Sequence, residues 1–271
     1  MIKLTNLKTS LALFGSILML ATPATALAAK PLHSGSGGSP SRVQTGNDVS
    51  WPQCEKPLPS GQLFGIVGVN GGLANTTNPC FSTELAWANK SIGGTGQDKA
   101  ALYVNTANPG NLGVSDWPTS GSSTKYGSCN GGDNQACAYV YGWTMAQNDA
   151  QSRIGSSNPA NFKWWLDVET DNSWETGSTG IANNVADLEG MTNYFQSVGS
   201  RIGLYSTASQ WKAIAGTVSS SSSLYGQDSW LAGSSSLTNA KNACTLPGLT
   251  DGKTTVTQYV ARQVDYDYSC V

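Results

Sequence analysis

The stretch FKWWLDVETDNSW, residues 162–174, carries acidic side chains inside an otherwise apolar and aromatic segment. Residues two apart lie on the same side of a β-strand. Asp167 and Glu169 therefore share one side with Trp165. The opposite side is apolar and consists of Trp164, Leu166 and Val168. This pattern predicts a strand whose apolar side packs on helices, while its acids point into a barrel near the end of the strand.

Similar β-prone runs recur along the chain and alternate with helical segments. The predicted strands are 47–51, 64–70, 101–106, 137–143, 163–169, 201–206, 229–233 and 255–260. The predicted helices are 81–90, 144–154, 179–199 and 207–216. Strands that alternate with helices pair in parallel, and eight of them in this length predict an α/β fold with a single (β/α)8-type TIM barrel. Some helical segments are weak, which points to an irregular barrel, and a doubly wound sheet is the alternative.

The first part of the chain has the features of a secreted precursor. Residues 1–29 form a predicted signal peptide, with lysines before an apolar run and small residues at the cleavage site. The apolar run is short for a membrane span of about 20 residues. Residues 30–46 are rich in Gly and Ser and predict a flexible linker. Residues 47–271 then form one domain, and we expect a secreted, monomeric protein with no membrane attachment after signal cleavage.

The six cysteines all follow the predicted signal peptide, and an even number in an exported chain predicts disulfides. A zinc site is the alternative, but no C-x-x-C spacing occurs. Loop length favours three pairs, which are Cys129–Cys137, Cys244–Cys270 and Cys54–Cys80.

Histidine and charge exclude several classes of function. The single histidine, His33, lies in the predicted linker, so a Ser-His-Asp triad or a His-ligated metal site is excluded. Catalysis would then depend on carboxylates, tyrosine or lysine, with no cofactor. Removal of residues 1–28 leaves 13 basic and 17 acidic residues, a formal charge of −4. No basic stripe is visible that would neutralise phosphates, which argues against nucleic acid as a partner.

Further acids lie on the first predicted strand and after the last one. Asp48, the acids of the fifth strand, and Asp265 would meet at the C-terminal rim of a barrel, where barrel enzymes have their active sites. Clustered like charges raise at least one carboxyl pKa, and two carboxyls are the usual minimum for glycoside hydrolysis. Asp267 is interpreted as a turn residue rather than a Ca²⁺ ligand. The aromatic residues expected to stack on sugar rings are Trp51, Trp143, Trp174, Tyr205 and Tyr259.

Several motifs in this order resemble glycoside hydrolase family 25, the Chalaropsis-type lysozymes. They are NDVSWPQ (47–53), WWLDVE (164–169), IGLYS (202–206), WLAG (230–233) and TQYVARQVDYD (257–267). The resemblance spans about residues 47–270, and LDVE is its most specific part. It implies an irregular β/α barrel that cleaves the β-1,4 bond between N-acetylmuramic acid and N-acetylglucosamine in peptidoglycan.

The resemblance also implies roles for individual residues. Glu169 matches the proton donor, and Asp167 matches the partner that acts as nucleophile or orients the 2-acetamido group of the substrate. Asp48 and Asp265 match two further acids that line the site. The chain departs from the family at Asn47, where Ile or Tyr is usual, in the missing histidine of the fourth strand, and in the long cysteine-bearing stretch 107–136.

We therefore expect a secreted, retaining glycosidase that acts on peptidoglycan or another cell-wall polysaccharide, and specifically a muramidase. One alternative is a non-catalytic barrel that binds wall glycan through its aromatic residues. Another is a structural domain stabilised by Ca²⁺ at Asp265 and Asp267. Chitinases of the D-x-x-D-x-D-x-E type fit less well, because Phe162 and Trp165 stand where two of their acids belong.

Overall fold

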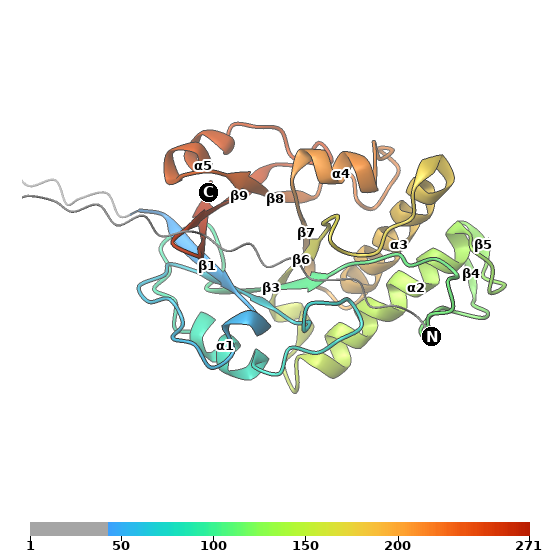
Figure 1. Ribbon diagram of the computed structural model, residues 1–271, viewed down its shortest axis with the longest axis horizontal. Coiled ribbons are helices and arrows are strands. Elements are labelled where there is room, and N and C mark those ends of the chain that lie inside the picture. The colour runs from blue at the N-terminus through green and yellow to red at the C-terminus, as the bar shows by residue number, and fades with distance from the viewer. Residues whose placement is uncertain (1–42) are drawn as a thin grey trace, which may run out of the picture. The chain divides into compact units, whose positions relative to one another are not determined.

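The computed structural model describes residues 43–271, and the predicted signal peptide lies outside these residues. Eight strands close into a barrel in the order β1-β10-β9-β8-β7-β6-β3-β2, which confirms the predicted fold class (Figure 1). The barrel strands are β1 (Thr45–Val49), β2 (Gly65–Gly68), β3 (Ala100–Asn105), β6 (Lys163–Asp167), β7 (Arg201–Ser206), β8 (Asp228–Ser234), β9 (Thr254–Ala261) and β10 (Val264–Ser269).

The helices lie outside the barrel and connect most of the parallel strands. They are α1 (Phe81–Ala88), α2 (Gln135–Asn148), α3 (Gly177–Ser197), α4 (Ala208–Ile214) and α5 (Leu237–Ala243). A π-helical turn at Asp149–Arg153 extends α2, and a small hairpin of β4 (Ser123–Thr124) and β5 (Gly127–Ser128) precedes it. Figure 1 shows α2 and α3 packed alongside each other, with this hairpin next to α2. Within residues 43–271, no helix combines the length and the apolar character that a membrane crossing requires.

The last strand makes the barrel irregular. β10 runs antiparallel to both of its neighbours, β9 and β1, whereas all other neighbouring strands are parallel. Arg262 and Gln263 form the two-residue turn before it, and both have positive φ, of 53° and 63°, as a tight hairpin requires. Because the chain reverses here, Asp265 lies at the beginning of β10 yet at the same rim as the ends of the parallel strands.

The structure corrects two predicted elements. The predicted strand 137–143 is wrong, because this segment belongs to α2, and β10 supplies the eighth strand instead. Asn134 caps α2 by accepting a hydrogen bond from the backbone N of Cys137 at 3.0 Å. Gly142 allows α2 to cross α3 closely, since a Cβ there would lie 2.0 Å from the backbone O of Asp187. Tertiary packing thus overrides the strand preference of the aromatic residues.

The predicted linker, residues 30–46, extends past the beginning of the first strand. β1 begins at Thr45, and Gly46 pairs with Asp267 of β10. A Cβ at Gly46 would lie 2.4 Å from the backbone O of Phe64, so the residue is packed into the barrel.

Two separate cores fill the structure, as the alternation around residue 165 predicts. Trp165 lies inside the barrel and meets Trp230 edge to face, with ring centroids 5.8 Å apart. Trp164 points outward and stacks on Phe195 of α3 at 4.4 Å. The inner core consists of Leu63, Phe64, Ile66, Ala101, Trp165, Trp230 and Val256. It fills the interior of the barrel below the C-terminal rim.

All three expected disulfides are present, namely Cys54–Cys80, Cys129–Cys137 and Cys244–Cys270. The first ties the chain after β1 to the beginning of α1. The second fixes the β4–β5 hairpin to α2. The third holds the end of the chain against α5. Cross-links of this kind stabilise mainly by restricting the unfolded chain.

Candidate active site

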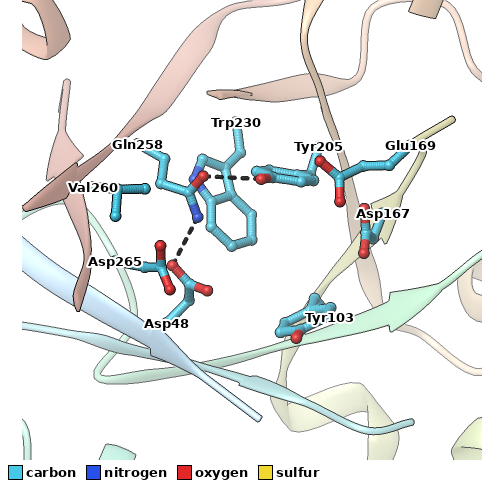
Figure 2. A pocket seen from close by; sticks show the side chains of 9 residues that line it. All are labelled: Asp48, Tyr103, Asp167, Glu169, Tyr205, Trp230, Gln258, Val260 and Asp265. Atoms are coloured by element: carbon cyan, nitrogen blue, oxygen red, sulfur yellow. Dashed lines mark hydrogen bonds between the residues drawn. The ribbon is translucent and has the colours of Figure 1, made fainter. Parts of the chain in front are cut away.

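A cavity of about 300 Å³ opens at the C-terminal rim of the barrel. Its lining residues come from seven strands or the segments that follow them, and are Asp48, Tyr103, Asp167, Glu169, Tyr205, Trp230, Gln258, Val260 and Asp265. All four acids predicted from the sequence meet here. Figure 2 shows Asp48 and Asp265 at one side and Asp167 and Glu169 at the other.

The segment that carries Asp167 and Glu169 is fixed at consecutive carbonyl oxygens. The donors are Thr106 Oγ1 to Asp167 O (2.6 Å), Ser206 Oγ to Val168 O (2.7 Å) and Trp174 Nε1 to Glu169 O (2.8 Å). Glu169 lies just beyond the end of β6 and is only partly buried. Its side chain therefore stands at the cavity mouth on a well-anchored backbone, which suits contact with a substrate.

A buried chain of hydrogen bonds leads to Asp167 from outside the barrel. Asn105 donates from Nδ2 to Asp167 Oδ2 at 2.9 Å. Asn70 accepts from the backbone N of Asn105 at 2.8 Å and donates to Asp149 Oδ1 at 2.9 Å. Arg153 pairs with the same oxygen of Asp149 at 2.5 Å. None of these supporting residues was predicted from the sequence. Their polar side chains do not recur at a spacing that would predict a chain of hydrogen bonds.

The opposite side of the cavity is organised by Gln258. Its Nε2 donates to Asp48 Oδ2 at 2.9 Å, and its Oε1 accepts from the Tyr205 hydroxyl at 2.9 Å. Burial, and secondly the charge of Asp265, raise the pKa of Asp48 to about 7. Gln258 thus connects one acid to an aromatic residue of the opposite wall, as Figure 2 shows.

Asp267 lies beneath this side of the cavity and is fully buried, so its interpretation as a turn residue is wrong. Neither carboxyl oxygen has a protein donor in hydrogen-bonding geometry. Burial, and then the neighbouring Asp48, raise the pKa of Asp267 well above its usual range. An ionised carboxyl without a donor or a cation is costly to bury, so burial favours the protonated form of Asp267.

The two acids after β6 also titrate above their usual range. Burial, followed by the charges of Glu169 and Asp48, raises the pKa of Asp167 well above normal. Burial and the charge of Asp171 raise the pKa of Glu169, while Gln210 and Tyr205 act in the opposite direction. The lining contains no Lys or Arg to offset these charges. Raised carboxyl pKa values favour the protonated form, which a general acid needs.

Aromatic side chains form the base of the cavity. Trp230 packs on Tyr205 with ring centroids 4.3 Å apart, and meets the edge of Tyr103 at 6.4 Å. Tyr205 was predicted here, but Tyr103, Trp230 and Gln258 were not. Period-two alternation with known inward residues would have found them, since each lies two positions from another inward side chain.

The other aromatic residues expected to bind sugar lie elsewhere. Trp143 is on the outer helix α2, next to Tyr194. Tyr259 faces away from the cavity and stacks on Tyr266 at 5.2 Å. Trp51 follows β1, is 47% exposed and does not line the cavity. Trp174 supports the Glu169 backbone through its Nε1.

Metal binding receives no structural support. Among residues 43–271, no group of three or more His, Cys, Asp and Glu side chains is arranged to hold a metal ion.

Comparison with known proteins supports the interpretation of the fold. No family model matches the sequence, and no curated protein matches it. Among solved structures, a muramidase from Acremonium alcalophilum superposes with a TM-score of 0.52 and 17% identity, over 84% of this chain and 93% of that chain. The chain has the fold of that muramidase. A family GH25 lysozyme from Aspergillus fumigatus is also similar, with a TM-score of 0.49, 16% identity and coverage of 84% and 93%. A bacterial lysozyme from Streptomyces coelicolor has a TM-score of 0.49, 17% identity and coverage of 85% and 93%.

Proposed function

We propose that this protein is a secreted glycoside hydrolase of the cell wall, and specifically a retaining muramidase. One observation carries the proposal. Asp167 and Glu169 at the end of β6 share a cavity with Asp48 and Asp265, and no cation lines it. Paired carboxyls of unequal protonation are what glycosidic bond cleavage requires. The muramidase fold and the three disulfides, which suit an oxidising compartment, support the same conclusion.

Glu169 serves as the general acid. Its raised pKa favours the protonated form, and its partial exposure gives access to the leaving oxygen. As the glycosidic bond breaks, the leaving oxygen takes this proton. The Glu169 carboxylate then accepts a proton from the water that adds to the anomeric carbon, which restores the starting state.

Asp167 stabilises the positive charge that develops at the anomeric centre, either directly or by orienting the 2-acetamido group of the substrate. Asn105 holds one of its oxygens, and the other oxygen, Oδ1, has no protein partner. The N–H of an acetamido group would supply the missing donor. Asp48 and Asp265 orient the substrate and adjust the pKa values of the cavity, while Tyr205 and Trp230 contact the sugar ring.

The test is the identity of the released products. Purified protein is incubated with peptidoglycan and, in parallel, with chitin, and soluble products are analysed by mass spectrometry. Muropeptides with new reducing muramic acid ends support a muramidase. Chitin fragments alone would indicate another glycosidase. Sedimentation with the wall and no product from either polymer would favour the non-catalytic binding barrel.

A further inference from the structure

A second groove lies outside the barrel, between α2 and the segment that begins the β4–β5 hairpin. Its volume is about 550 Å³, and it shares no lining residue with the acid cavity. The lining residues are Ser122, Ser123, Thr124, Lys125, Tyr139, Val140 and Trp143. The groove combines aromatic rings with a row of hydroxyl side chains.

Two aromatic rings form a platform in this groove. Tyr139 and Trp143 are one helical turn apart on α2, and the planes of their rings are nearly parallel, at 25°, with centroids 6.4 Å apart. The platform is supported from α3. Asn193 donates to the Tyr139 hydroxyl at 3.0 Å, and Tyr194 packs edge-on against Trp143 at 5.3 Å. Both platform rings remain partly exposed. Because the contacts from α3 hold them, their orientation is set before any ligand binds.

The groove presents no uncompensated charge. Lys125, its one charged lining residue, pairs with Glu189 of α3 at 2.6 Å. The remaining polar groups are the neutral hydroxyls of Ser122, Ser123 and Thr124. An anionic ligand would find the positive charge already paired. The Thr124 hydroxyl donates to the Gly127 carbonyl at 2.9 Å, so the exposed hydroxyls of Ser122 and Ser123 are the ones open to a ligand.

The groove is built by the long insertion between β3 and α2. The disulfide Cys129–Cys137 fixes the hairpin to α2. Gly121 brings the chain close to the helix, since a Cβ there would lie 2.8 Å from Cγ2 of Val140. This is the stretch that departs from the family 25 pattern, so the groove is not part of the resemblance.

We propose that this groove binds an uncharged polysaccharide strand, with sugar rings stacked on Trp143 and Tyr139 and their hydroxyls bonded to Ser122 and Ser123. A pyranose has an apolar C–H face and a polar rim, and the groove offers the complement of both. The site would hold a polymer on the protein surface at a distance from the acid cavity. The proposal does not depend on the chain being a muramidase.

Binding is measured in the full chain carrying Glu169→Gln, so that cleavage does not interfere. The probes are an N-acetylglucosamine hexasaccharide, followed by calorimetry, and insoluble chitin, followed by sedimentation. Trp143→Ala and Tyr139→Ala are each expected to weaken binding at least about tenfold, since each removes one of the two stacking rings. Trp143→Phe keeps a ring and should bind nearly as well as the parent. Trp51→Ala, which removes another exposed tryptophan outside both cavities, serves as the matched control.

Thermal melting of every variant separates loss of binding from loss of folding. Folded Trp143→Ala and Tyr139→Ala proteins that bind both probes like the parent would overturn the proposal. If the parent binds no saccharide but self-associates, and Trp143→Ala abolishes this self-association, the proposal is overturned. The groove would then be an interface between two copies of this chain. If wild-type protein releases no product but Trp143-dependent binding persists, only the proposed hydrolysis fails.

Discussion

Asn105 donates a hydrogen bond of 2.9 Å from its Nδ2 to Oδ2 of Asp167, whose Oδ1 has no partner in the protein. The contact links the cavity to the buried ion pair of Asp149 and Arg153 through Asn70. Asp167 is thus held from one side only, and its second oxygen is available to a substrate. This arrangement gives Asp167 a fixed orientation in a cavity where repulsion between acids would otherwise displace it.

Loss of this contact should change the pH dependence of activity. The hydrogen bond favours the ionised form of Asp167, so Asn105→Ala raises an already elevated pKa further. Because Asp167 then ionises only at higher pH, the acidic limb of the kcat profile should move to higher pH. We expect kcat at the optimum to fall about 10–100-fold, as for other hydrogen bonds to charged groups. Asn111→Ala, at an exposed asparagine, is the control. An unchanged acidic limb would show that Asn105 does not act through Asp167.

Replacement of Asp267 by its neutral isostere should stabilise the protein. A buried carboxyl whose pKa is raised in the folded state stabilises the fold fully only below its unfolded pKa of about 3.9. This stabilisation is lost as the pH rises through the pKa of the folded state. Asp267→Asn removes this pH-dependent loss of stability, because an amide does not ionise. Its Tm should therefore exceed that of the wild type at pH 7, and the difference should shrink toward pH 4. A Tm below wild type at both pH values would mean that Asp267 is ionised and paired.

Gly142→Ala should disrupt the packing of α2 against α3. The added Cβ would lie 2.0 Å from the backbone O of Asp187, and backbone cannot move aside as a flexible side chain can. We expect a loss of about 1–3 kcal/mol in the free energy of unfolding, typical of overpacking, measured by urea denaturation. Gln147→Ala, on the same helix, should change stability by less than about 0.5 kcal/mol. Equal stability of the two variants would contradict the close crossing.

The sequence predicted the features that follow from local alternation. Asp167 and Trp165 face inward and Trp164 faces α3, as period two requires. The three disulfide pairs followed from loop length and export. The barrel class followed from the alternation of strands and helices, because each parallel crossover needs a helix, but the strand order did not, since 137–143 is helical and β10 is the eighth strand.

What the sequence did not predict depends on contacts between distant segments. Residues 137–143 have the composition of a strand, but the glycine at 142 matters only because α3 approaches it. Trp143 was assigned to the site because the segment was taken as a strand. The hydrogen bond from Gln258 to Asp48 joins residues 210 positions apart, and the pairing of β10 with β9 places Asp265 opposite Val260. A single sequence contains no signal for such long-range register.

The most direct test of the central claim compares wild-type protein with Glu169→Gln on the same peptidoglycan, by the rate at which reducing muramic acid ends form. Glu55→Gln, at an exposed glutamate outside the cavity, is the matched control. We expect wild type and Glu55→Gln to release muropeptides at similar rates, and Glu169→Gln to be slower by about 10²–10⁴-fold while its melting curve is unchanged. Product formation by Glu169→Gln at a rate near that of the wild type would contradict the assignment of Glu169 as the general acid.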